Sequence, residues 1–211
     1  MGMADTTPWK YGLSGGALAL DFANTVGWRK RAKRAEHLRN YADLLAWAKS
    51  AGALSGPEAE RLAGEGRRRP GATSAALRRA LRLREAIYGL FSALALRAAP
   101  AAEDLRALNA ALPAALSRLR IGVSENVPAW EWTGDELALD RMLWPVARSA
   151  ADLLTSQHLG RVRECGDEHC GWLFLDTSRN QSRRWCSMSD CGNRAKARRH
   201  YARTRSGKVK G

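Results

Sequence analysis

The sequence predicts a mainly α-helical fold: a multihelical N-terminal domain with a small β-hairpin, followed by a compact C-terminal module. Apolar residues recur at helical spacing through most of the first 160 residues, and only residues 118–133 alternate as a hairpin does. All four cysteines fall between Cys165 and Cys191, beyond the point near Gly160 where the helical pattern stops. We therefore expect two domains, residues 1–160 and 161–211.

The first three helices are predicted from periodicity and from their end signals. Residues 17–26 should form a helix entered after two glycines, and residues 38–51 a second one that ends at Gly52, because glycine favours helix C-termini. A third begins at Ser55-Gly56-Pro57-Glu58, where Ser55 or Gly56 can cap, Pro57 fits the first turn and Glu58 suits the helix dipole. Residues 64–71, with three arginines before Pro70, are expected to form a loop.

The remaining elements of the first domain include its longest helix. Residues 73–98 form that helix, and residues 103–119 the next, with an interruption near Pro113. In the predicted hairpin, Ile121 and Val123 alternate on one strand and two tryptophans on the other, around a turn at 125–126. Residues 139–159 return to helical spacing, and Pro145 should kink that helix or mark its true start.

Charge is concentrated at the C-terminal end. The chain of 211 residues has a formal net charge of +14. Residues 161–211 contain 13 Lys and Arg against 5 Asp and Glu, a net of +8, whereas the first 160 contain 22 against 16, a net of +6. Such asymmetry is typical of a nucleic-acid-binding tail, although a solvated basic tail would look the same. The sequence contains no run of 18 apolar residues, so it predicts no membrane span.

The cysteines follow the pattern C-x4-C-x15-C-x4-C. Two close pairs separated by a hairpin-sized spacer can bring four sulfurs together around one tetrahedral zinc ion. The alternatives are two disulfides or four ordinary buried thiols. Residues 1–10 lack the apolar stretch of a signal peptide, so we expect a reducing cytoplasmic location and disfavour disulfides. His169 adjoins Cys170 and is the one competing ligand. With Cys165, Cys170, Cys186 and Cys191 all bound, zinc has no open position and is structural.

A treble-clef-like arrangement is expected around these cysteines. Gly166 and Gly171 permit a tight first knuckle. Residues 172–175 and 184–186 should pair as two strands, and Ser189 or Asp190 should cap a helix with Cys191 in its first turn. Four thiolates on Zn²⁺ leave a net charge of −2, which basic neighbours can offset: Arg183, Arg184 and Arg194.

The last helix is too basic to be buried. Arginine and lysine occupy most of its circumference and would gain from contacts with phosphates, each of which releases a condensed counterion. Lys196, Arg199 and Arg203 share one face and are the strongest DNA-contact candidates. Asn193 and Arg194 lie beside Cys191, where a structural role competes with a role in binding. The full set of nucleic-acid candidates is Arg183, Arg184, Arg194, Lys196, Arg198, Arg199 and Arg203.

Two segments resemble known families. Residues 174–196, with Arg183-Arg184-Trp185-Cys186-Ser187-Met188 and the tetrapeptide Cys191-Gly192-Asn193-Arg194, closely resemble the CGNR zinc finger. Residues 13–25, with Leu18-Ala19-Leu20-Asp21-Phe22-Ala23-Asn24-Thr25, resemble the opening motif of the ABATE domain. That domain is the usual N-terminal partner of CGNR fingers in bacterial proteins described as candidate stress-induced transcription regulators. The resemblance implies that the first domain senses a signal and the finger delivers it to DNA.

The N-terminal domain carries no recognisable catalytic motif. We find no phosphate-binding glycine loop and no nucleophile elbow, so we predict no enzyme. Asp21 and Asn24 are polar residues among apolar ones, and they either cross-link helices or face a small-molecule pocket. A DNA-binding zinc regulator is the favoured function. RNA binding and a protein-interaction module are the alternatives, and a homodimer and a small-molecule effector are further expectations.

Overall fold

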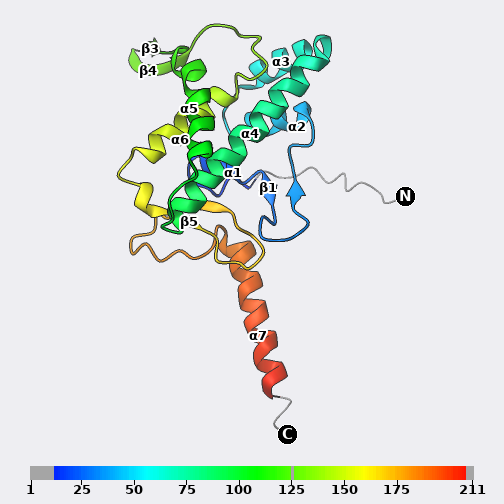
Figure 1. Ribbon diagram of the computed structural model, residues 1–211, viewed down its shortest axis with the longest axis vertical. Helices are drawn as coiled ribbons and strands as arrows, with labels where there is room; N and C mark the ends of the chain where they lie inside the picture. Colours follow the sequence, from blue (N-terminus) through cyan, green and yellow to red (C-terminus); the bar gives the residue numbers. More distant parts are fainter. Residues whose placement is uncertain (1–11, 125, 208–211) are drawn as a thin grey trace, which may run out of the picture.

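The computed structural model describes residues 12–124 and 126–207 and shows a helical body from which one helix projects (Figure 1). The body contains α1 (Leu18–Ala23), α2 (Tyr41–Ser50), α3 (Gly56–Arg68), α4 (Pro70–Ala95), α5 (Ala102–Leu116) and α6 (Leu143–Leu154). The projecting helix is α7 (Asn193–Gly207). Among the described residues, no helix is both long and apolar enough to cross a membrane. The predicted fold class, mainly helical with small antiparallel hairpins, is confirmed.

Three two-stranded antiparallel sheets complete the fold. They pair β1 (Val26–Gly27) with β2 (Ala35–Glu36), β3 (Leu119–Ser124) with β4 (Val127–Trp132), and β5 (Val162–Glu164) with β6 (Leu173–Leu175). The β3–β4 hairpin was predicted; its Asn126 has φ +64 in the turn, while Glu125 lies outside the described residues. This hairpin lies at the end of the molecule opposite α7 (Figure 1).

The short helix α1 lies at the centre of the core. Leu20 and Phe22 are fully buried, and the Phe22 ring meets Trp47 of α2 with centroids 4.8 Å apart. Burial of a side chain of this size contributes about 2–3 kcal/mol. No side chain of α1 caps its start. Instead Ser149 of α6 accepts a hydrogen bond from the Ala19 amide at 3.1 Å, so the helix terminus is satisfied from across the core.

The helix-end signals of the body were mostly predicted correctly, with two errors: the loop at 64–71, and the interruption near Pro113, which lies inside the continuous helix α5. Ser55 and Glu58 form the reciprocal capping box of α3, and Pro145 lies in the first turn of α6, marking its start. The loop expected at 64–71 is wrong, because α3 continues to Arg68 and α4 begins at Pro70. The helix persists because Glu65 binds Arg68 and Arg69 one turn away and Gly66 packs closely on Tyr41.

The strands around the cysteines also differ from the prediction. We expected residues 172–175 to pair with 184–186, but β6 pairs with β5, which precedes the first cysteine. Residues 184–186 wrap around the first knuckle instead: the Arg184 carbonyl accepts from the Gly166 amide at 2.8 Å. The β5–β6 hairpin packs on α1 and α4. Its Val162 and Leu173 belong to the same buried cluster as the body, so the expected boundary near residue 160 has continuous packing across it.

Candidate metal centre and nucleic-acid interface

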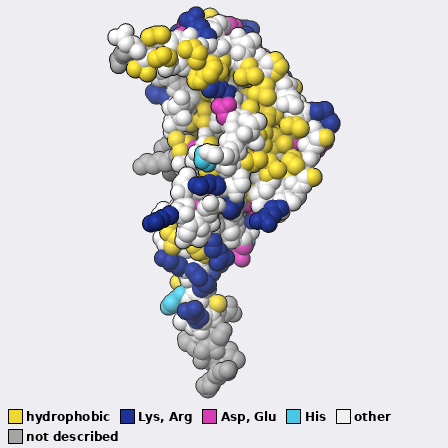
Figure 2. Space-filling model, turned by 90° about the vertical axis from the view of Figure 1, so that its left-hand side faces the viewer, with side chains coloured by type: hydrophobic (Ala, Val, Ile, Leu, Met, Phe, Trp, Pro, Cys, Tyr) yellow, Lys and Arg dark blue, Asp and Glu magenta, His cyan; other side chains and the backbone are white. Residues whose placement is uncertain are grey.

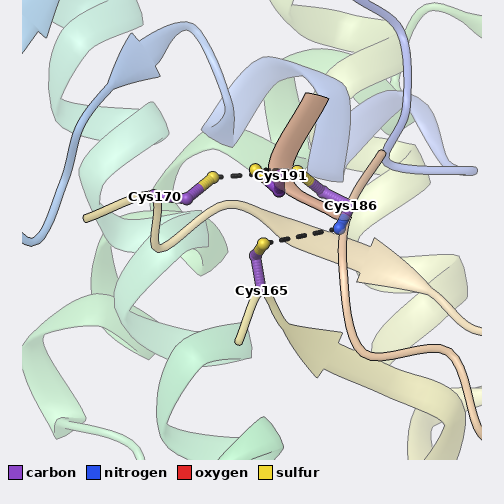
Figure 3. A group of neighbouring side chains, drawn as sticks. All are labelled: Cys165, Cys170, Cys186 and Cys191. Atoms are coloured by element: carbon purple, nitrogen blue, oxygen red, sulfur yellow. Dashed lines mark hydrogen bonds between the residues drawn. The ribbon is translucent and has the colours of Figure 1, made fainter. Parts of the chain in front are cut away.

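The four cysteines converge on one point (Figure 3). Their sulfurs all lie within 4.8 Å of one another, and every one of the four residues is buried. The Sγ atoms of Cys170 and Cys186 are 3.7 Å apart, and those of Cys186 and Cys191 are 3.6 Å apart. Tetrahedral zinc with Zn–S bonds of about 2.3 Å places its sulfurs about 3.8 Å apart. The cluster therefore has the size and the chemistry to bind one structural zinc ion.

Three segments deliver these sulfurs. Cys165 follows β5, and its backbone amide donates a hydrogen bond to the Trp172 carbonyl at 2.8 Å. This hydrogen bond closes the first knuckle. Gly171, at φ +70, makes the turn after Cys170, a conformation that other residues rarely adopt. The Cys186 amide donates to the Cys165 sulfur at 3.5 Å, and such N–H···S contacts stabilise a thiolate.

Cys191 lies in a short π-helical turn, Met188–Gly192, that leads into α7. Ser187 caps this turn by accepting from the Asp190 amide, so the caps expected at Ser189 or Asp190 are wrong. The extra residue of a π turn advances Cys191 to the cluster before the regular helix begins. His169 is not part of the sulfur cluster: its imidazole is 41% exposed and lies beside Glu168.

Arginines compensate the sulfur cluster on one side. Arg194 donates to the Cys191 sulfur at 2.8 Å and also binds Asp190 and the buried Asp167. Burial by itself would lower the pKa of Arg194, but the neighbouring Cys191, Asp190 and Asp167 raise it above its ordinary value. Arg198, one turn later, binds Asp167 at 3.0 Å and Glu168 at 3.4 Å. These contacts give Arg194 and Arg198 a structural role.

Arg183 and Arg184 differ in their surroundings. Arg183 donates to the carbonyls of Trp185 and Cys186 and lies 4.5 Å from the centroid of Phe174, so it is committed to the interior of the finger. Arg184 is exposed and stacks on Trp185. Of the two, only Arg184 presents its charge to solvent.

The remaining candidates on α7 lie on its opposite side. Lys196, Arg199 and Arg203 fall within one stripe of the helix, about half a turn around from Arg194 and Arg198. All three are exposed, and none forms an ion pair with any residue that the structure describes. We call these three residues the α7 stripe. Its positive charge is not balanced by an ion pair with any of residues 12–124 and 126–207.

Asp21 and Asn24 hold the finger against the body. The side-chain amide of Asn24 donates a hydrogen bond to the backbone carbonyl of Leu173 and accepts one from the backbone amide of Leu173, both at 2.8 Å. It takes the place of a neighbouring strand. Asp21 accepts from the Gly15 amide at 2.8 Å, and the Gly15 carbonyl accepts from the Leu175 amide at 2.7 Å. The backbone groups on the free edge of β6 therefore find hydrogen-bond partners in Asn24 and in Gly15, which Asp21 holds in place. This arrangement supports the structural interpretation of Asp21 and Asn24.

Asp21 provides a pH prediction. Burial raises the pKa of Asp21 to about 6, against two backbone hydrogen bonds that lower it. A carboxyl whose folded pKa is raised adds stability below its unfolded pKa of about 4 and loses it as the pH rises to about 6. Asp21→Asn keeps the acceptor and removes the titration. We expect the free energy of unfolding of the wild type, relative to this variant, to fall by about 1–2 kcal/mol between pH 4 and 6.5. Urea titrations at four pH values measure it, and a pH-independent difference contradicts it.

Two groups of residues escaped the sequence prediction. Asp167 gave no signal, because an acidic residue between two cysteines is indistinguishable from an exposed turn residue until Arg194 and Arg198 are seen on it. The second group is the loop of residues 28–34 between β1 and β2, which contacts the first knuckle: the Arg29 amide donates to the Cys170 carbonyl at 3.0 Å. The sequence did hold a signal for this loop, because five of the six residues at positions 29–34 are basic.

Comparison with known families agrees with the site geometry. Residues 16–157 match the ABATE family, described as "Putative stress-induced transcription regulator", and residues 161–204 match the CGNR zinc finger. No curated protein matches the chain. The cysteine cluster and the Asp21–Asn24 motif lie within the two matched segments. The chain thus belongs to the ABATE family and carries a CGNR zinc finger at its C-terminal end.

Proposed function

We propose that this protein is a cytoplasmic transcriptional regulator that binds DNA through α7, with the zinc cluster fixing the base of that helix. The observation that carries the proposal is the unbalanced charge of the α7 stripe. On one side of α7, Arg194 and Arg198 are neutralised by Asp167 and its neighbours. On the other, Lys196, Arg199 and Arg203 face solvent. A polyanion is the natural partner of such a surface.

The exposure of α7 supports this proposal. The helix projects from the body, and Lys and Arg side chains gather around its base and along it (Figures 1 and 2). An isolated helix of 15 residues is marginally stable in water, so a long basic helix that the other described residues contact mainly near its base indicates that a ligand completes it. A helix of this width fits the major groove of B-DNA. The description of the ABATE family as a regulator favours the same function.

RNA binding is the second candidate, and one observation favours it. Tyr201 on α7 is 67% exposed, and an exposed ring can stack on an unpaired base. The ring lies well around the helix from the α7 stripe, however, and single-strand modules generally use several such rings. We therefore favour duplex DNA. The proposal assigns the protein a binding role and no catalytic one.

The N-terminal domain is proposed to sense a signal or to dimerise. A cavity of about 270 Å³ lies between α4, α5 and α6 and offers room for a small effector. Four alanines of α5 line it together with Leu83, Leu143 and Trp144 and with three charged residues, Arg79, Arg82 and Asp140. The outer part of the β3–β4 hairpin exposes Ile121, Val123 and Trp130, an apolar surface available to a second copy. Sedimentation equilibrium of the wild type and of Trp130→Glu would test the dimer.

Substitution of the α7 stripe tests DNA binding. Lys196→Ala, Arg199→Ala and Arg203→Ala together remove about three phosphate contacts, so the slope of log K against log salt should become shallower by about 3. Zinc content and thermal stability should persist, because none of the three residues has an ion pair within the part of the chain that the structure describes and alanine favours helix. Fluorescence anisotropy measures the affinity for a mixed-sequence 20-base-pair DNA duplex and for a single-stranded RNA at several salt concentrations, and so tests both candidate functions. An unchanged slope on both probes excludes α7 as the binding surface.

A further inference from the structure

We infer that the β1–β2 loop of the helical body (residues 28–34) forms a second part of the nucleic-acid surface, on the side of α7 opposite the α7 stripe. The inference rests on the proposed function and extends it, because it assigns DNA contacts to the ABATE domain itself. The loop is separated from the finger by more than 130 residues of sequence, yet it lies beside the base of α7 (Figure 1).

The loop is fastened to the first zinc knuckle. The amides of Arg29 and Lys30 donate to the carbonyls of Cys170 and His169, at 3.0 and 3.3 Å. The Lys30 ammonium binds Glu164 of β5 at 2.8 Å. Gly171 has no side chain at the point of closest approach, where an added Cβ would lie 3.1 Å from the Cβ of Arg29. The loop and the finger therefore move as one unit.

Trp28 joins the loop to α7 directly. Its backbone has φ +54, an uncommon conformation for a tryptophan, which is held here by the contacts around it. The guanidinium carbons of Arg31 and Arg194 lie 4.4 and 4.8 Å from the centre of its ring. Arg31 from the loop and Arg194 from the first turn of α7 are thus placed on one aromatic platform. Stacking of this kind leaves the N–H edges of Arg31 available to phosphate oxygens, whereas those of Arg194 already bind Asp167, Asp190 and Cys191.

The charges of the loop divide into two groups. Arg29 is neutralised by Glu85 at 2.8 Å and Lys30 by Glu164. No acidic residue occurs between Asp21 and Glu36, and Glu36 is itself bound by Arg84 at 2.6 Å. The other three, Arg31, Lys33 and Arg34, are exposed and form no ion pair with any described residue. The loop therefore presents three unbalanced positive charges.

The separation of the two groups suits one duplex. Lys196, Arg199 and Arg203 lie about 3, 8 and 14 Å along the helix from Arg194, given a rise of 1.5 Å per residue. Arg194 contacts the same ring as Arg31. Since Arg194 faces the loop and the α7 stripe lies about half a turn around the helix from Arg194, the two groups lie on opposite sides of α7. A helix in the major groove, which is about 12 Å wide, has a phosphate backbone on either side, so the stripe contacts one strand and the loop the other. The six cations form the two sides of one phosphate-binding site built from both family segments.

The test compares three matched variants of the full chain. The loop variant carries Arg31→Ala, Lys33→Ala and Arg34→Ala. The second is the α7 triple variant described above. The control removes three exposed arginines on α3, α4 and α5 that form no ion pair with any described residue, with Arg67→Ala, Arg78→Ala and Arg106→Ala. All three variants lose the same charge, so a general electrostatic effect shows in the control. Zinc content and melting temperature are measured for each.

The loop variant should make the slope of log K against log salt on the 20-base-pair duplex shallower by about 2–3, and the control should leave it unchanged. Combining the loop and α7 changes should make it shallower by about 5. A wild-type slope in the loop variant, with loss only in the α7 variant, overturns the inference and leaves the proposed function intact. Unchanged slopes in both overturn both. A shallower slope in the loop variant alone overturns the two-sided surface.

Discussion

Removal of zinc from the full-length protein is expected to destabilise the helical body as well as the finger. Val162 and Leu173 of the β5–β6 hairpin are buried in the core of the body, so unfolding of the finger uncovers that core. Without a cation, hydrogen bonds among the crowded sulfurs and burial raise the pKa values of the Cys170 and Cys186 thiols. Four thiolates therefore cannot persist there, and the cluster loses the interaction that holds its three segments together.

The size of this effect follows from zinc energetics. Structural zinc contributes about 10–16 kcal/mol in finger peptides. If on the order of 5 kcal/mol of it supports the body, the melting temperature should fall by about 10–20 °C. Metal analysis should give about one zinc per chain, and circular dichroism with and without a chelator follows the melting. His169→Ala is the matched control and should retain both zinc and stability. Well under half an equivalent of zinc, or helical melting that ignores the chelator, would contradict the prediction.

The same measurement bears on domain organisation. The division into residues 1–160 and 161–211 stays a prediction, and the packing of Val162 and Leu173 indicates that the first part is weakened when the second is absent. A fragment of residues 1–160 should therefore melt below the full chain. Equal melting temperatures would establish two independent domains. They would also show that the contacts of β5 and β6 with the body contribute little to its stability.

Asn24→Ala should have the second-largest effect on stability. Asn24 is 1% exposed and satisfies both backbone groups of the buried Leu173. Alanine leaves one amide and one carbonyl without partners, each at a cost of about 1–3 kcal/mol. We expect a loss of about 3 kcal/mol and faster release of zinc to a chelator, because the edge of β6 is no longer held. Thermal melting and a colorimetric zinc assay measure the two effects.

Two further variants sharpen this prediction. Asn109→Ala, at an exposed position on α5, is the matched control and should change stability by less than about 0.5 kcal/mol. Asn24→Asp keeps the acceptor for the Leu173 amide but sets a carboxylate against the Leu173 carbonyl, so it should be at least as harmful as alanine. Equal stability of the Asn24 and Asn109 variants would show that water replaces the lost hydrogen bonds.

Sequence patterns predicted the local features well and the long-range ones poorly. The capping box at Ser55 and the β3–β4 hairpin depend on neighbouring residues, and both were predicted. The convergence of Cys165, Cys170, Cys186 and Cys191 was predicted because metal ligation constrains spacing. Helix α3 was ended too early because the stretch from Gly64 to Gly71, with three arginines before Pro70, suggested a loop. Contacts with Tyr41 and Thr73 keep Gly66, inside that stretch, helical.

The site itself shows the same division. The basic character of α7 follows from the sequence, but its separation into two faces does not, because it depends on where Asp167 lies. The role of Asn24 and the place of the β1–β2 loop depend on contacts between segments more than 130 residues apart. Periodicity carries no information about such contacts, and a single sequence offers no other route to them.

Because the finger packs against the core of the body, any rotation of the core helices is transmitted to α7. A helix of 15 residues is about 22 Å long, and its base is held by the cysteine cluster and by the Arg194 and Arg198 contacts with Asp167. Cys165 of that cluster directly follows β5, and β5 and β6 pack on α1 and α4. A rotation of only about 10° at those helices would sweep the far end of α7 through about 4 Å, slightly more than the 3.4 Å between successive base pairs. Small repacking inside the body is thereby amplified into a displacement large enough to move the tip out of register with the groove.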